Sequence, residues 1–340
     1  MGAIIGRIFI IGLFAFGLAT CGPRATLMSE ADEAKIGARE HAKMIKEFGG
    51  VYDDTELGAY VAGIGLRVVQ GSRKPDAPYR LTILDSPIVN AFALPGGYIY
   101  ITRGLLALVN SEAELAAVLG HEIAHVTARH GAHRHTQGVG TSVAAGVLSA
   151  VLGNRAANQI IELGWRAWLS KYNRTQEYEA DKLGVETLYR AGYDAHGAAD
   201  FLAAMGAYSE LTAQLRGNSA TVPGWFATHP NTDDRVDKAE ALAEQLQPND
   251  KADISVSIGR APYLAAIDGM RYTEIPTKQG EQAKPLKIKI IEVQPQDTVA
   301  SLVARMQVSA LPEQHFRILN NYMPDDKVRP GQKVKLVVAD

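Results

Sequence analysis

The spacing of apolar residues predicts a chain that is helical over most of its length. Between residues 53 and 70, Leu57, Val61, Ile64 and Val68 recur at the interval that places them on one helical face. Similar spacing predicts helices over residues 29–48, 53–70, 111–135, 156–189, 195–211 and 233–245, and strict alternation predicts strands over residues 79–84 and 97–102.

The sequence changes character near Asp250. Residues 273–285 are rich in proline, glutamine, lysine and glycine, which is typical of a linker. The pattern that follows predicts a strand, two helices and a second strand, over residues 286–293, 297–306, 312–320 and 334–338. We therefore expect an α+β fold, with a mostly helical domain that holds a small β-sheet, followed by a small βααβ module.

The first 20 residues have the features of a secretory signal. They contain one charge, Arg7, and an apolar run over residues 8–19. As a helix this run spans about 18 Å, which is short of the roughly 30 Å bilayer core. The lone Cys21 follows Leu-Ala-Thr, an order that resembles a bacterial lipobox, and Gly22 favours an acylated anchor in the outer membrane facing the periplasm. The alternatives are an ordinary signal peptide or a short anchor, with Cys21 incidental.

Composition narrows the class of protein. The chain has 340 residues, of which 46% are hydrophobic and 21% charged, as in folded globular proteins. Its net charge of −2 gives no basic surplus, so we expect no nucleic-acid partner. One cysteine cannot form an internal disulfide, and a mean hydropathy near zero excludes a polytopic membrane protein.

Residues 121–125 read His-Glu-Ile-Ala-His and predict a metal site. In a helix, His121 and His125 lie about 40° apart around the axis and about 6 Å along it, so both imidazoles can face one ion. Glu122 lies beside that ion, where it can act as the general base that takes a proton from the attacking water. The alternative is a polar helix that happens to be rich in histidine.

Other nearby histidines do not fit the same ion. On a straight helix His130 projects to the opposite face from His121, and His135 lies about 21 Å further along the axis. We expect His130, His133 and His135 to be surface or supporting residues. The metzincin pattern is also excluded, because Ala128 and Gly131 stand where it needs glycine and histidine.

A third metal ligand is expected from a later helix. Glu177 and Asp181 are four residues apart and share one helical face. Glu177 would bind zinc, Asp181 would hold a ligand histidine through its free ring nitrogen, and Glu179 would point elsewhere. The alternative is that these acidic residues bind no metal and only form the solvent-exposed face of a helix.

Four segments in this order resemble the gluzincin family of HtpX and the CAAX-prenyl endopeptidases. They are the His-Glu-Ile-Ala-His motif, the Glu177-to-Asp181 pair, the segment 90–106 (Asn-Ala-Phe-Ala-Leu-Pro-Gly-Gly-Tyr-Ile-Tyr-Ile-Thr-Arg-Gly-Leu-Leu) and the segment 227–235 with its His-Pro pair. The resemblance covers roughly residues 30–245. It is closest in kind to the soluble, periplasmic BepA-type branch, because no further membrane span is predicted after residue 20.

The resemblance implies roles for individual residues. One zinc ion per chain would be bound by His121, His125 and Glu177, with Glu122 as general base. His229 and Arg235 would lie near the site. His229 would either stabilise the oxyanion or occupy the fourth zinc position at rest; an ordinary loop histidine is the alternative. Tyr98, Ile99, Tyr100 and Ile101 would form an edge strand that pairs with a peptide substrate, or would simply pack in the core.

The C-terminal module resembles LysM, through residues 297–306, 318–321 and 329–336. It would bind peptidoglycan or dock onto an assembly machine. The apolar stretch 139–152 is too short to span a bilayer and would cover the active site or pack in the core. The expected organisation is a lipoprotein signal peptide, a zinc peptidase domain, a connecting segment with a linker, and the LysM-like module, over residues 1–20, 21–248, 249–285 and 286–340.

Together these features predict a zinc endopeptidase of the bacterial cell envelope, lipid-anchored in the periplasm, that cleaves unfolded or misassembled proteins. Two alternatives remain: a non-enzymatic, zinc-stabilised chaperone or cell-wall-binding scaffold, and a peptidoglycan amidase. Glu122 favours an enzyme, because a structural zinc site needs no base. The Glu177 arrangement favours a peptidase over an amidase.

Overall fold

The computed structural model describes residues 28–134, 172–216, 224–229, 234–247, 258–273 and 285–340. Several subjects of the sequence analysis lie wholly or partly outside these ranges: the signal segment with Cys21, the apolar stretch 139–152, His135, residues 156–171 of the predicted helix 156–189, residues 230–233 of the His-Pro segment, and residues 274–284 of the predicted linker. In the part of the chain that is described, no helix combines the length and the apolar character that crossing a bilayer requires.

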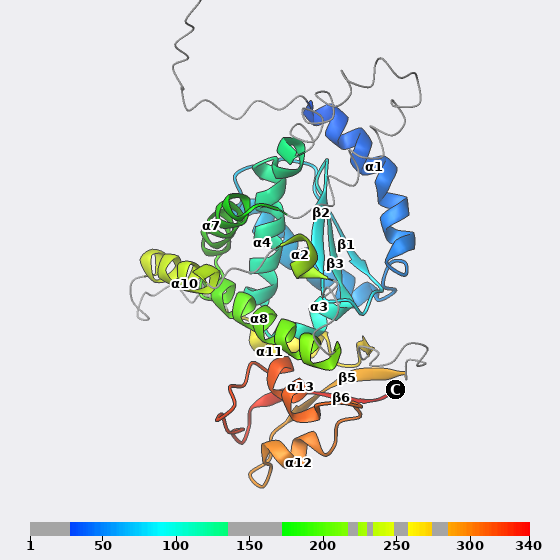
Figure 1. Cartoon of the computed structure of the whole chain (residues 1–340), viewed down its shortest axis with the longest axis vertical. Coiled ribbons are helices and arrows are strands. Elements are labelled where there is room, and N and C mark those ends of the chain that lie inside the picture. The colour runs from blue at the N-terminus through cyan, green and yellow to red at the C-terminus, as the bar shows by residue number, and fades with distance from the viewer. Residues whose placement is uncertain (1–27, 135–171, 217–223, 230–233, 248–257, 274–284) are drawn as a thin grey trace, which may run out of the picture.

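A three-stranded sheet lies at the centre of the N-terminal part (Figure 1). It contains β1 (Arg80–Leu84), β2 (Ala91–Leu94) and β3 (Tyr98–Thr102), in the order β1-β3-β2. Strand β3 pairs in parallel with β1 and antiparallel with β2. The prediction that Tyr98–Thr102 is an edge strand is therefore wrong, because both of its sides are already paired. Strands β1 and β2 are the two outer strands of this sheet.

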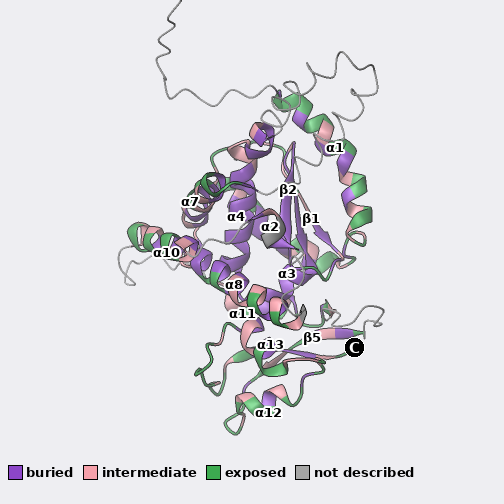
Figure 2. Cartoon of the chain, in the orientation of Figure 1, coloured by how far each residue is buried: buried purple, intermediate pink, exposed green. Residues whose placement is uncertain are grey.

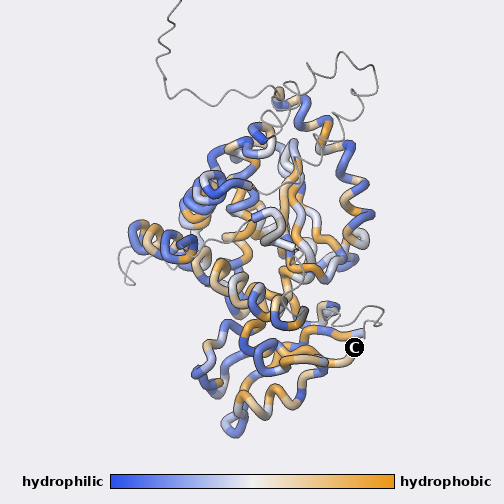
Figure 3. Tube along the Cα trace, in the orientation of Figure 1, coloured by the Kyte–Doolittle hydropathy of each residue, from blue (hydrophilic) through white to orange (hydrophobic). Residues whose placement is uncertain are grey.

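The two faces of the sheet contact different helices, which explains why every residue of β3 is buried. Tyr98 and Tyr100 pack in one cluster with Met44 of α1 (Glu30–Glu47). Ile99 and Ile101 face the opposite way and join the main core, which includes residues of α2 (Thr55–Gly71). A strand covered on both faces needs apolar side chains at every position. Figure 3 shows these strands as apolar chain beside the more polar helix α1.

The remaining helices of this part pack together on the side of the sheet away from α1 and at its lower end (Figure 1). They are α3 (Arg103–Leu108), α4 (Glu112–Thr127), α7 (Arg174–Arg190), α8 (Gly197–Arg216), α9 (Trp225–Thr228) and α10 (Asp234–Leu246). Helix α4 is buried along most of its length (Figure 2). The fold is mostly helical with small sheets, as the α+β prediction states.

Helix α4 ends earlier than the sequence predicts. A helix was expected to continue to residue 135, but α4 ends at Thr127. Arg129 then adopts a positive φ of 53°, which a helix cannot contain, and helical backbone resumes at His130. The Arg129 guanidinium is held by an ion pair of 2.9 Å with Glu33 of α1. The break therefore depends on a contact that lies far away in the sequence.

The C-terminal part contains the predicted strand-helix-helix-strand order. Its elements are β5 (Leu286–Glu292), α12 (Val299–Val303), α13 (Pro312–Leu319) and β6 (Lys333–Ala339). A third strand, β4 (Arg271–Tyr272), pairs with β5 and completes a sheet in the order β4-β5-β6. Strand β4 and helix α11 (Arg260–Ala266) both come from residues 249–285, which the sequence analysis treats as a connecting segment and linker.

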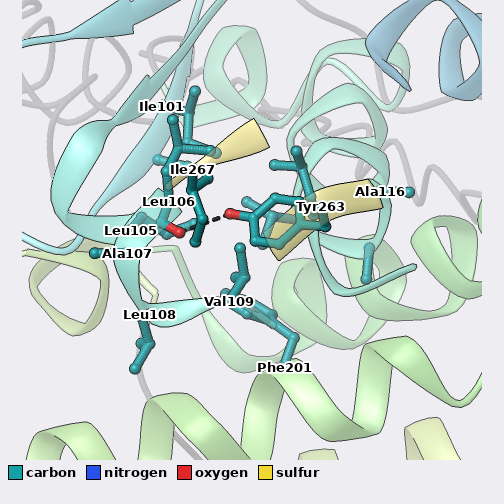
Figure 4. Packing of buried hydrophobic residues seen from close by; sticks show 14 of the residues in the cluster. Ile101, Leu105, Leu106, Ala107, Leu108, Val109, Ala116, Phe201, Tyr263 and Ile267 are labelled. Carbon is teal, nitrogen blue, oxygen red and sulfur yellow. Dashed lines mark hydrogen bonds between the residues drawn. The ribbon is translucent and has the colours of Figure 1, made fainter. Parts of the chain in front are cut away.

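Two buried polar contacts fix the C-terminal part to α3. Lys335 of β6 is fully buried, and its Nζ donates to the carbonyls of Ala107, Leu108 and Val109 at 2.8, 2.9 and 3.0 Å. The Tyr263 hydroxyl of α11 donates to the carbonyl of Leu106 at 2.6 Å within the apolar core (Figure 4). These carbonyls lie at the end of a helix, where no intrahelical N–H can reach them.

Candidate active site

Helix α4 carries the three residues of the metal motif. The Ser111 hydroxyl caps the helix by accepting from the backbone N–H of Glu114. His121 and His125 are one turn apart, and their Nε2 atoms lie 3.0 Å from each other. Glu122 is completely shielded from solvent. The helix therefore presents both imidazoles to one point, with a carboxylate beside them.

Helix α7 brings a glutamate to the same point. Gly120 of α4 faces Gly184 of α7, and a Cβ on Gly120 would lie 3.1 Å from the Gly184 carbonyl oxygen. The two glycines therefore allow the helices to approach closely. Glu177 lies on the face of α7 that is turned toward α4. Its Oε2 is 3.8 Å from Nε2 of His121, and its Oε1 is 3.6 Å from Nε2 of His125. The structure thus brings together the three residues that the sequence proposes as ligands.

Asp181 and Arg235 support this cluster from behind. Oδ1 of Asp181 lies 3.0 Å from Nδ1 of His121, the nitrogen that faces away from Glu177. Arg235 of α10 donates to both Asp181 oxygens at 2.7 Å and lies 2.9 Å from Glu177. Although burial opposes ionisation, the hydrogen bonds from His121 and Arg235 lower the pKa of Asp181 to about 2. The carboxylate is therefore a permanent anion beside His121.

His229 completes the group of buried donors. It follows α9, where its ring stacks on Trp225 at a centroid distance of 4.1 Å. Its Nδ1 lies 3.1 Å from Glu177 and 3.2 Å from His121, and its Nε2 lies 3.5 Å from Glu122. Four donors therefore lie within 4.8 Å of one another, from His121, His125, Glu177 and His229.

The electrostatics of these residues fit a metal ion. Burial lowers the pKa of His125 and of His229 well below the usual histidine value, so both rings are neutral. Burial raises the pKa of Glu177 to about 7. Burial and the nearby Glu177 raise the pKa of Glu122 well above its ordinary value, and neither Glu122 oxygen makes a hydrogen bond of normal geometry with a described residue. Neutral imidazoles and a crowded carboxylate are the donors that zinc-type ions bind.

Two aromatic residues of the site were missed by the sequence analysis. Tyr172 stacks on His125 at a centroid distance of 3.7 Å, and the guanidinium of Arg134 lies 3.5 Å from the Tyr172 ring centre. Trp225 stacks on His229 from the other side. Neither aromatic residue stands at a fixed interval from the metal motif, so only the fold places it there.

His130 is a supporting residue of the site, one of the two roles expected for it, but it lies on a different face from the one predicted. The sequence analysis placed it on the face opposite His121, by assuming a straight helix. Because α4 breaks at Arg129, His130 turns back and becomes buried, with Nδ1 2.7 Å from Nδ1 of His125. Its Nε2 lies 3.3 Å from Glu179, whose side chain is 46% exposed. Glu179 is thus outside the donor group, as expected.

Comparison with known proteins identifies the family. Residues 56–243, more than half of the chain, match the model of peptidase family M48. A beta-barrel assembly-enhancing protease of Yersinia pestis is 31% identical over 59% of this chain and 42% of its own length. Its counterpart in Escherichia coli is 27% identical over 61% of this chain and 43% of its own.

A second group of relatives is mitochondrial. The metalloendopeptidase OMA1 of Schizosaccharomyces pombe is 28% identical over 63% of this chain and 62% of its own length. The chain spans less than half the length of the two bacterial relatives and less than two thirds of this one. The matched region contains the whole donor group and the helices that carry it. The chain therefore belongs to peptidase family M48.

Proposed function

We propose that this chain is a zinc-dependent endopeptidase of the bacterial envelope that cleaves unfolded or misassembled proteins. The observation that supports it most is the convergence of four buried donors within 4.8 Å, with Glu122 beside them. His121, His125 and Glu177 would hold one zinc ion per chain. A purely structural site would gain nothing from a buried carboxylate that makes no hydrogen bond of normal geometry with a described residue.

Glu122 is the proposed general base. Zinc, when bound, would polarise the scissile carbonyl and lower the pKa of the attacking water. Glu122 takes the proton of that water and delivers it to the leaving amine. Burial and the nearby Glu177 raise its pKa, and a more basic carboxylate accepts a proton more readily. Asp181 and Arg235 keep His121 and Glu177 in place while this happens.

The edge of β2 is the proposed substrate-binding strand, in place of β3. The backbone N–H of Thr102 donates to the carbonyl of Asn90, so these two residues form a hydrogen-bonded pair. In an antiparallel ladder, hydrogen-bonded pairs alternate with non-hydrogen-bonded pairs. The backbone N–H and C=O groups of Ala91 and Ala93 therefore face away from β3. The Ala93 amide lies close enough to Glu122 to oppose the rise in its pKa. No other described strand pairs with this side of β2. An extended peptide added there would pass the base with little dependence on its sequence.

The substrates, partners and location are proposed from the relatives. The names of the bacterial relatives describe proteases that enhance beta-barrel assembly. We propose unfolded or misassembled outer-membrane polypeptides as substrates and the periplasm as the location, with acylated Cys21 as the outer-membrane anchor. Residues 286–340 are the proposed LysM-like module, which would contact peptidoglycan or an assembly machine.

A second candidate function follows from how closed the site is. His229 and Glu122 are fully buried, and the cavity beside His125 and Tyr172 has a volume of only about 20 Å³. A zinc-stabilised chaperone or scaffold without activity would also have a closed site. Activity on an unfolded protein separates the two functions.

The test measures zinc content and proteolysis together. We expect one equivalent of zinc in the wild-type chain and hydrolysis of unfolded casein that stops when a chelator removes the metal. Glu177→Ala should lose the zinc, because a catalytic site depends on three protein ligands. Glu186→Ala, on the same helix but paired with Arg73, is the matched control and should keep it. Zinc without any proteolysis would favour the scaffold, and absence of zinc would reject both functions.

His229 is proposed to hold the fourth zinc position at rest. Its distances to Glu177 and His121 support this role over that of an oxyanion stabiliser. We expect His229→Ala to raise casein hydrolysis at equal zinc loading. The rise should equal the inverse of the fraction of wild-type molecules in which His229 has left the zinc. If that fraction is one in ten, the rise is about tenfold. An oxyanion role would instead lower kcat by roughly 10²-fold. His196→Ala, which removes a surface histidine paired with Glu240, is the control.

A further inference from the structure

The two histidines of the metal motif are supported by different partners. His121 has a carboxylate behind it, since its Nδ1 lies 3.0 Å from Asp181, which is itself fixed by Arg235. Among the described residues, no carboxylate occupies that position beside His125. Its Nδ1 instead lies 2.7 Å from Nδ1 of another histidine, His130. A metal-binding histidine needs an acceptor for its second ring N–H, so the partner of His125 must be able to accept.

The contact between these two histidines is built into the fold. Arg129 has a positive φ of 53° and is tied to Glu33, and this reversal carries His130 back against the end of α4. His130 is 1% exposed, so water does not compete for its ring nitrogens. Glu179 of α7 reaches it from the side, with Oε2 3.3 Å from Nε2.

Only one arrangement of protons satisfies all three side chains. Nε2 of His125 faces Glu177 and His121, so this nitrogen must be free of a proton to bind a metal, and the proton is on Nδ1. The Nδ1–H of His125 then donates to Nδ1 of His130, which must be unprotonated. A neutral His130 therefore carries its proton on Nε2, where the acceptor is Glu179.

We propose that His130, fixed by Glu179, is a positioning residue that sets the tautomer and ring orientation of His125. The proposal rests on the proposed metal site and adds to it the support of the second histidine. Glu179, although it is not a ligand, acts on the site through His130. The relevant chemical feature is a hydrogen-bond acceptor at the position of Nδ1 of His130. The side-chain oxygen of an asparagine can also provide this acceptor.

The test compares zinc affinity in variants that keep or remove this acceptor. We expect His130→Leu to bind zinc about 10- to 100-fold more weakly in competition with a chromophoric chelator. His130→Asn should recover most of that loss. Glu179→Ala should keep one zinc but bind it more weakly, whereas Glu179→Gln, whose amide oxygen still accepts, should resemble wild type. His196→Leu removes a histidine that pairs with Glu240 at 3.0 Å away from the site and should change nothing.

Spectroscopy provides readouts that packing alone would not alter. The visible absorption of the cobalt-substituted protein should change in His130→Leu and return toward wild type in His130→Asn. In wild-type zinc protein, ¹⁵N NMR should show His130 with a bare Nδ1 and a protonated Nε2; this measurement holds even where a variant fails to fold.

Three results would overturn the proposal: wild-type affinity in His130→Leu, equal loss in the leucine and asparagine variants, or a proton on Nδ1 of His130. If the wild-type chain binds no zinc, the proposed function fails and this proposal fails with it. Zinc binding by wild type with no effect of the His130 variants would overturn only the present proposal.

Discussion

Glu122→Gln is expected to reduce peptide hydrolysis by at least ~10³-fold while the metal stays bound. Glutamine has the shape of glutamate but cannot take a proton from water. Glu122 is not among the proposed ligands, so its loss leaves His121, His125 and Glu177 in place. The measurement is kcat/KM on casein at equal zinc content, with Glu186→Gln of α7 as the control.

The same substitution should stabilise the metal-free chain. The Glu122 carboxylate is fully buried, has no hydrogen bond of normal geometry within the described residues, and is close enough to Glu177 to be repelled by it. Replacing this ionisable group by a neutral amide removes its repulsion from Glu177 and is expected to raise the free energy of unfolding by about 1 kcal/mol, as measured by urea denaturation. Hydrolysis within tenfold of wild type would show that another residue is the base.

Lys335→Met is expected to lower the free energy of unfolding by about 3 kcal/mol. Methionine fills much of the same space but cannot donate to the carbonyls of Ala107, Leu108 and Val109. The carbonyl of Leu108 would keep a hydrogen bond from Asn110, but those of Ala107 and Val109 would lose their donor while still bearing the cost of removal from water. The loss should appear as a lower urea midpoint for the chain as a whole, because the apolar core is continuous from α3 to β6.

The matched control for Lys335 lies on the same strand. Lys333 is exposed and two residues away, so Lys333→Met should change stability by no more than about 0.5 kcal/mol. If the two methionine variants unfold at the same urea concentration, the buried ammonium adds nothing to stability. In that case the fit between β6 and α3 would rest on apolar contacts alone.

Much of the fold and of the donor group could be predicted because it depends on the spacing of residues within single helices and strands. The apolar interval of Leu57, Val61, Ile64 and Val68 corresponds to α2, and the strand-helix-helix-strand order after residue 285 is the observed one. His121 and His125 are one turn apart in any helix. Glu177 was predicted by the same argument of helical register on a second element.

The failures all involve contacts between distant segments. The central place of β3 depends on its parallel pairing with β1, which the alternation of its own residues does not encode. The break after α4 depends on the ion pair between Arg129 and Glu33. Without that break, His130 would point away from His125. Tyr172 reaches His125 only because α7 is folded against α4.

The buried Lys335 also bears on how such a chain could be altered by recombination. A domain on an exposed tether can be exchanged for another without loss to its neighbour. Here a replacement for residues 286–340 would need a lysine that reaches the end of α3. It would also need a strand in the place of β5 that pairs with β4. Exchanging the C-terminal residues alone would therefore leave the carbonyls of Ala107 and Val109 without the donor that Lys335 provides.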